Sequence, residues 1–191
     1  MQFLFTCDAG GTGTALSHHA GRRQPAPETP STPVPETPAV KTPKKGDKVS
    51  DDKKTGSYII TSSEKKEVAY KAPANKNAKT ITIPATIKVK GVTYKVTKIA
   101  DNSFRNNKKI TEITIGKNIV SIGKNAFYGC KKLKTITIRS KKLTSKTVSK
   151  NAFKGLTRIT TIKVPKNKLT AYKKLLKKKG LSSKVKVKGY K

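Results

Sequence analysis

Three segments of the chain share one pattern of apolar and polar positions. Residues 110–115, 133–138 and 159–164 each have an apolar residue, two polar residues, and then apolar, polar and apolar residues. The alternation at the end is typical of a strand with one buried face, and its β-branched residues suit such a strand. Ile110 precedes Leu133 by 23 residues, and Leu133 precedes Ile159 by 26. The pattern predicts stacked coils of about 23 residues, whose equivalent strands form a parallel sheet.

A second phrase repeats in step with these strands. Ile-Gly-Lys-Asn-Ala-Phe at 122–127 returns as Asn-Ala-Phe at 151–153 and, in an earlier form, as Asp-Asn-Ser-Phe at 101–104. Units of this length bury their apolar faces against one another, so the three phenylalanines should form a buried aromatic ladder. The predicted core consists of apolar residues at equivalent positions: Phe104, Ile113, Ile115, Ile122, Phe127, Cys130, Ile136, Ile138, Phe153, Leu156, Ile162 and Val164.

Both ends of the repeat region carry patterns that predict caps. Two short apolar segments within 58–79 predict a β-hairpin over the first coil, and alternation around Gly91 predicts a hairpin insert. Apolar residues at helical spacing predict an amphipathic helix at 168–179, followed by a strand at 185–187. Such a basic helix is also typical of membrane surfaces. We favour the cap, because an uncapped stack would expose its core.

The first 57 residues lack the repeat. Residues 24–57 are rich in Pro, Thr and Lys, which predicts a disordered linker. Residues 1–23 begin with an apolar run that is too short, and lacks the preceding positive charge, for a signal peptide. We interpret the chain as a fragment, or one with a misassigned start, of a longer exported protein. The predicted organisation is a tail (1–23), a linker (24–57) and a repeat domain (58–191) divided into 58–79, 80–109, 110–132, 133–158 and 159–191.

The run at 113–130, Ile-Thr-Ile-Gly-Lys-Asn-Ile-Val-Ser-Ile-Gly-Lys-Asn-Ala-Phe-Tyr-Gly-Cys, resembles the BspA-like leucine-rich repeats, also called the Treponema pallidum type, of bacterial surface proteins. The resemblance covers residues 58–191, with insertions in the copies at 80–109 and 133–158. It implies a mainly β solenoid, a short leucine-rich repeat array with a hairpin cap, a helix-plus-strand cap and a disordered N-terminal tail. It also implies a secreted or cell-surface protein that mediates adhesion.

The net charge of +34 is distributed unevenly. Residues 1–57 hold eight Lys/Arg and six Asp/Glu, whereas residues 58–191 hold 36 and four, with no acid after Glu112. Such a field attracts polyanions. Alternatively, the lysines only solvate the surface and protect strand edges, which is the interpretation that we favour. Lysine outnumbers arginine and aromatic residues are few, so we expect no specific nucleic-acid partner.

No residue pattern predicts catalysis, a metal site or a cofactor. Cys130 occupies the position of Leu156 in the next repeat, which indicates a buried thiol rather than a disulfide with Cys7. His18 and His19 are adjacent in the tail and lack ligand spacing to any Cys or acid. The chain offers no nucleophile–base pair either. We therefore expect that it is not an enzyme.

Two functions remain open. The first is a non-enzymatic extracellular or cell-surface interaction module of a gut- or oral-type bacterium, for adhesion or for protein or glycan binding. The alternative is a basic cell-wall-retention module appended to a larger surface enzyme. We expect a monomer without a transmembrane segment, whose partner is a protein or an anionic glycan or wall polymer. The candidates for the outward face are the second residues of the strands (Thr111, Lys134 and Thr160) and the fifth residues (Thr114, Thr137 and Lys163), and the sequence leaves open which set faces solvent. The candidate ligand contacts among them are Lys134, Lys163, Thr114 and Thr137.

Overall fold

The structure, a computed structural model, describes residues 43–157 and 160–191. All of these residues belong to one compact unit, Ala39–Lys191. The predictions for the tail at 1–23 and for the first part of the linker, up to residue 42, lie outside the described residues, as does Ile159.

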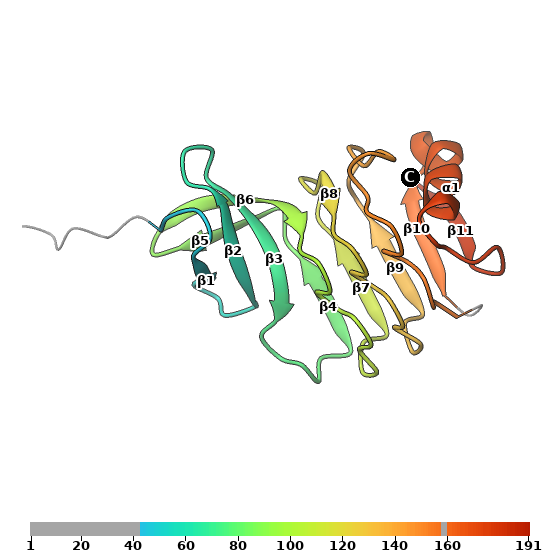
Figure 1. Ribbon diagram of the computed structural model, residues 1–191, viewed down its shortest axis with the longest axis horizontal. Coiled ribbons are helices and arrows are strands. Elements are labelled where there is room, and N and C mark those ends of the chain that lie inside the picture. Colours follow the sequence, from blue (N-terminus) through green and yellow to red (C-terminus); the bar gives the residue numbers. More distant parts are fainter. Residues whose placement is uncertain (1–42, 158–159) are drawn as a thin grey trace, which may run out of the picture. The chain divides into compact units, whose positions relative to one another are not determined.

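The predicted repeat strands form one parallel sheet. Its five strands are arranged in the order β4-β7-β9-β10-β11, and Figure 1 shows them side by side. They are β4 (Thr80–Ile83), β7 (Glu112–Ile115), β9 (Thr135–Ile138), β10 (Thr161–Pro165) and β11 (Lys186–Tyr190). The strand expected at 185–187 therefore becomes the last strand of this sheet.

The register of the sheet aligns equivalent residues of successive coils. Ile113 lies opposite Ile81 on one side and Ile136 on the other, and Ile136 lies opposite Ile162. These four side chains are buried, as the alternation of apolar and polar residues requires. A second buried row follows two residues later, made of Ile83, Ile115, Ile138 and Val164.

A second sheet carries the N-terminal cap and runs on into the coils. Its strands β2 and β3 form the predicted antiparallel hairpin, and β5 and β6 form the hairpin around Gly91. The pairing from β3 to β6 to β8 is parallel and links consecutive coils. The order of the strands in this sheet is β1-β2-β3-β6-β5, and β8 also pairs with β6. The bounds of the six strands are β1 (Lys48–Ser50), β2 (Gly56–Ser62), β3 (Glu67–Pro73), β5 (Thr86–Val89), β6 (Val92–Ile99) and β8 (Ser121–Ile122).

An aromatic ladder fills the core between the coils. The rings of Phe104 and Phe127 stack with centroids 5.3 Å apart, and those of Phe127 and Phe153 with centroids 5.4 Å apart. Tyr70 of β3 continues the stack at 5.4 Å from Phe104, and Tyr58 of β2 meets Tyr70 edge-on. The ladder therefore extends from the repeats into the N-terminal cap.

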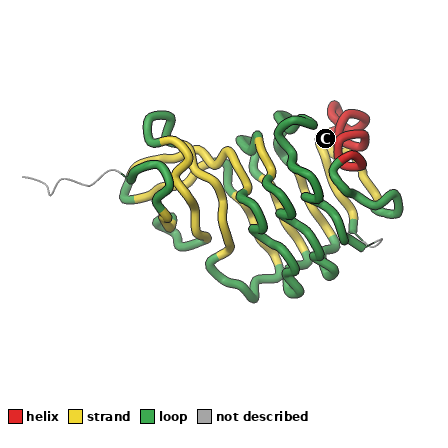
Figure 2. The backbone as a smooth tube through the Cα atoms, viewed as in Figure 1, coloured by secondary structure: helices red, strands yellow, loops and turns green. Residues whose placement is uncertain are grey.

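The rest of the repeated phrase lies in the turns opposite the parallel sheet, which Figure 2 shows as loops. The backbone N–H of Phe104 donates to Ala126 O at 2.9 Å, and that of Phe127 donates to Ala152 O at 2.9 Å. These turns need a residue with positive φ, which asparagine tolerates well. Asparagines supply it at 58°, 53° and 57° in the three coils, at Asn102, Asn125 and Asn151 respectively.

The C-terminal helix closes the core at the far end of the repeats. A short 3₁₀ turn, η1 (Lys166–Lys168), leads into α1 (Leu169–Lys178), which buries Tyr172, Leu175 and Leu176. The Tyr172 hydroxyl donates to Ser140 O at 2.9 Å and accepts the N–H of Leu143 at 3.2 Å. The loop that receives this hydroxyl contains the three-residue insertion seen in the sequence.

The linker prediction was wrong for residues 43–57. These residues include β1, which pairs antiparallel with β2. Asp51 is buried and accepts hydrogen bonds from the Thr55 N–H, the Thr55 hydroxyl and the Gly56 N–H at 2.8–3.0 Å. Asp52 accepts the Lys90 N–H at 2.9 Å, which ties the segment to the β5–β6 turn. The ordered cap therefore begins before Tyr58, because Asp51 and Asp52 accept hydrogen bonds from backbone N–H groups.

Candidate functional site

The outer face of the parallel sheet presents two straight rows of polar side chains. In each strand the residues between the buried positions are exposed or half-buried, and the register aligns them across all five strands. Neighbouring members of a row are about 4.8 Å apart, the spacing of paired strands. Both rows change from threonine to lysine toward β11. The first row is Thr80, Glu112, Thr135, Thr161 and Lys186, and the second is Thr82, Thr114, Thr137, Lys163 and Lys188.

The structure brings three of the four candidate ligand contacts together. Thr114, Thr137 and Lys163 are consecutive members of the second row. Lys134 is exposed but lies just before β9, outside both rows, and its N–H donates to Thr111 O at 2.7 Å. Thr160, a further second-position residue, is buried, with its hydroxyl donating to Leu133 O at 2.6 Å. The second position of each strand is therefore not part of the outer face.

Sequence reasoning missed the first row. Its repeat members Glu112, Thr135 and Thr161 are the third residues of the strands, and each shares a face with the fifth residue. The strict alternation of strand side chains would have identified these positions, because residues two apart always point to the same side. The two rows together, rather than isolated residues, form the candidate surface.

The residues expected in the repeat core are all buried in the structure. Cys130 is fully buried, and its thiol donates to Phe104 O at 2.9 Å. Burial raises the pKa of this thiol to about 11, against the ordinary value of 9.0. The thiol therefore stays protonated at neutral pH and is a poor nucleophile. The corresponding position one coil earlier is Asn107, whose side chain accepts the N–H groups of Lys109 and Ile110.

Most acidic residues of the described chain accept hydrogen bonds from backbone N–H groups. Besides Asp51 and Asp52, Asp101 accepts the Lys124 N–H at 2.8 Å. Beyond Glu112 the sequence has 24 Lys/Arg and no acid, so the positive field is concentrated on β9, β10, α1, β11 and their loops. The lysines of this half lack acidic partners within it, and an external anion would meet an uncompensated field.

Residues 43–157 and 160–191 contain no group of three or more His, Cys, Asp or Glu side chains that could hold a metal ion. Within the same ranges, no helix has the length and apolar character needed to cross a bilayer.

Residues 66–187 match the family model of the BspA type leucine rich repeat region, in six copies. The chain belongs to the BspA-type leucine-rich repeat family. Its fold is accordingly a leucine-rich repeat fold, with strand-rich sheets and one α-helix near the C-terminus. Membership of this family indicates a surface interaction module.

Two solved structures are similar to the BspA-type chain. A leucine rich cell surface protein from Faecalibacterium prausnitzii A2-165 is 26% identical, with a TM-score of 0.48, over 62% of this chain and 33% of that one. A leucine-rich repeat protein from Bacteroides capillosus ATCC 29799 is 18% identical, with a TM-score of 0.46, over 70% of this chain and 94% of that one. The match thus spans about a third of the first protein. No curated protein matches the chain.

Proposed function

We propose that the protein is a non-enzymatic interaction module that works outside the cell or at the cell surface. It binds a protein or an anionic glycan through the outer face of its parallel sheet, for adhesion. The observation that carries this proposal is the lysine end of the two rows. Lys163 lies directly opposite Lys188 in the register of β10 and β11, and Lys186 lies in the neighbouring row.

Like charges directly opposite each other in a sheet are destabilising. Lys163, Lys186 and Lys188 are all exposed on the same face, and no acid of the C-terminal half can neutralise them. A bound carboxylate or sulfate would relieve this repulsion. The threonine hydroxyls of the same rows add donors and acceptors beside the charge, since each hydroxyl can both donate and accept. A carbohydrate chain that carries acidic groups suits this combination.

We further propose that the coils form a short solenoid that acts as a monomer and is capped at both ends. The buried Tyr58 and Tyr70 cover the first coil, and the buried face of α1 covers the last. The proposed repeats are 80–109, 110–132 and 133–158, with a C-terminal cap at 159–191. The N-terminal cap is extended from 58–79 to include β1. A repeat array presents an extended surface for binding.

Binding of the full chain to immobilised heparin, with uncharged dextran as the blank, tests the proposal. Lys163→Gln should weaken heparin binding by roughly threefold or more, the effect of losing one exposed ion pair. Lys150→Gln is the matched control, because Lys150 is an exposed lysine of a turn outside the parallel sheet. Absence of heparin binding, or equal losses in both variants, would contradict recognition by the outer face.

The second candidate function is retention on an anionic wall polymer. It is favoured by the absence of acids after Glu112, which leaves lysines on loops, helix and sheet alike unneutralised. Purified phosphodiester wall polymer should then capture the chain, and every lysine should contribute similarly. Lys163→Gln and Lys150→Gln would weaken capture equally, and moderate salt would abolish it. Capture that is indifferent to salt would exclude electrostatic retention.

A further inference from the structure

Among the described residues, strand β11 is the last strand of the parallel sheet, and one of its edges is unpaired. It pairs with β10 on one side, and no other strand of the described residues pairs with it on the other. In a parallel strand alternate residues direct their N–H and C=O groups to opposite sides. Half of the backbone groups of Lys186–Tyr190 therefore point away from β10. Such an edge is a template for a further strand.

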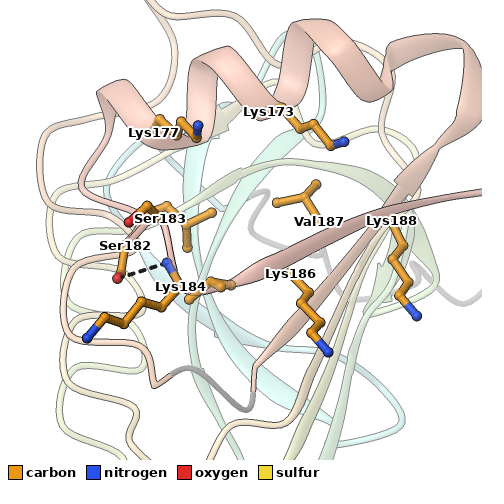
Figure 3. Close-up of a pocket in the computed structure, with 10 residues that line it drawn as sticks. Lys173, Lys177, Ser182, Ser183, Lys184, Lys186, Val187 and Lys188 are labelled. Atoms are coloured by element: carbon orange, nitrogen blue, oxygen red, sulfur yellow. Dashed lines mark hydrogen bonds between the residues drawn. The ribbon is translucent and has the colours of Figure 1, made fainter.

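A groove follows this edge. Its volume is about 420 Å³, and its lining includes the continuous segment 182–188 and two lysines of α1, Lys173 and Lys177. In Figure 3 these two lysines lie along α1, facing β11 across the gap, and Val187 points into the gap. Lys186 and Lys188 project from the opposite side of the strand. The groove therefore combines strand backbone, an apolar floor and lysines on both rims.

The lysines determine which strand this edge can accept. Edge lysines discourage pairing with neutral or basic strands. A second copy of this chain offers only such strands after Glu112, because that half contains no acid. The same charges favour an acidic strand, whose alternate side chains on the α1 face would meet Lys173 and Lys177. Repulsion of unsuitable strands together with attraction of the right one is a general route to specificity.

We propose that the groove between α1 and β11 binds an extended acidic peptide segment of a partner protein, which adds to β11 as a further strand. Main-chain hydrogen bonds to the free edge hold the segment, and its carboxylates, which alternate strand positions direct to the α1 face, pair with Lys173 and Lys177. Strand addition to an exposed sheet edge is a recurrent mode of peptide recognition.

This groove adjoins the proposed ligand surface on the sheet and shares β11 with it. Lys173 and Lys177 belong to α1 and not to the outer face, so their loss tests the groove alone. The full chain is titrated with a capped synthetic peptide of alternating Glu and Val at physiological salt, where distant lysines are largely screened. The double variant K173Q/K177Q should weaken binding roughly fivefold, as expected for two lost ion pairs.

The matched control is K131Q/K132Q, which removes the same charge from two exposed lysines that do not line the groove. It should weaken binding less than about twofold. A peptide of alternating Glu and Pro keeps the charge but loses half of its N–H donors and the strand φ, so it should bind weakly. Amide hydrogen exchange should show alternate β11 residues newly protected by the Glu-Val peptide.

Three results would overturn the proposal. The Glu-Val peptide fails to bind, or K131Q/K132Q and K173Q/K177Q weaken its binding equally. In the third result, inorganic polyphosphate or the Glu-Pro peptide binds as well as the Glu-Val peptide and no β11 amide gains protection, which would mean attraction by charge alone. Heparin binding by K173Q/K177Q reports separately on the outer face, so failure of one surface is distinguishable from failure of the other.

Discussion

Replacing Phe127 by alanine removes the centre of the aromatic ladder. Its ring is fully buried and lies between Phe104 and Phe153, with interplanar angles of 6° and 20°. Both faces of the ring are therefore in contact with aromatic neighbours. Truncation leaves a cavity in the middle of the ladder. The flanking rings cannot close it without moving their coils, which are tied to the central coil by hydrogen bonds from the Phe104 N–H to Ala126 O and from the Phe127 N–H to Ala152 O.

The expected loss of stability is about 4 kcal/mol, within the usual range for Phe→Ala in a core. Two stacking contacts, each worth about 0.5–1.5 kcal/mol beyond burial, place the site toward the upper part of that range. A domain of this size has a total stability of about 5–15 kcal/mol. The variant should therefore fold but be marginal. The adjacent Tyr128 is only half-buried, with Arg105 5.7 Å over its ring, and Tyr128→Ala should cost about 1 kcal/mol.

Urea unfolding followed by far-UV circular dichroism measures both variants. With a slope of about 2 kcal/mol per molar urea, Phe127→Ala should lower the midpoint by about 2 M and Tyr128→Ala by about 0.5 M. Equal midpoint shifts in the two variants, at unchanged slope, would refute the reasoning, because the neighbouring aromatic lacks the stacked partners. A changed slope would instead indicate that the array no longer unfolds as one unit.

Three further predictions concern the core and the cap. In a Cys7→Ser background, Cys130 should resist a thiol reagent at mildly alkaline pH until the chain is unfolded, since its pKa of about 11 leaves little thiolate. Rapid reaction of the folded chain would contradict the burial of Cys130. Asp51→Ala should lower the free energy of unfolding by about 2 kcal/mol, because three hydrogen-bond donors lose their buried carboxylate acceptor. Asp47→Ala, at an exposed site, should lower it by less than half as much. Equal urea midpoints of the two variants would rule out a stabilising role of Asp51 in the segment 43–57. Burial raises the pKa of Tyr58 from 10.0 to about 12, so the folded state favours the neutral phenol. The free energy of unfolding should therefore be highest below pH 10 and fall as the pH rises toward 12, and this fall should be shallower in the Tyr58→Phe variant.

The repeat strands and the ladder were predictable because they depend on local periodicity. An alternation of Ile with Thr specifies which side of a strand is buried, and a phrase that returns at fixed spacing specifies which residues become neighbours. Phe104, Phe127 and Phe153 stack for that reason. Tyr70 was not placed in the ladder, because its segment lacks the phrase and joins the stack only through the parallel pairing of β3 with β6.

The candidate surface was only partly predictable. Thr114, Thr137 and Lys163 were identified, whereas the row that contains Thr135 and Thr161 was missed. Exposure at the second position of each strand depends on how the preceding turn enters the strand. Thr160 continues the buried alternation of Ile162 and Val164, whereas Lys134, two residues before the buried Ile136, departs from the alternation and is exposed.

The sequence by itself determined the stack: its period, its buried positions, its aromatic ladder and a positive charge that grows toward the C-terminus. Only the tertiary structure decided what surrounds that stack. It placed β11 beside β10, so that Lys163 faces Lys188 and a free basic edge remains, and it drew residues 43–57 into the cap through Asp51 and Asp52. The physical reason is the distance in sequence between the residues that interact. Burial follows from neighbours within one coil, whereas edges, caps and rows of charge arise from pairings between segments whose separation in sequence carries no periodic signal.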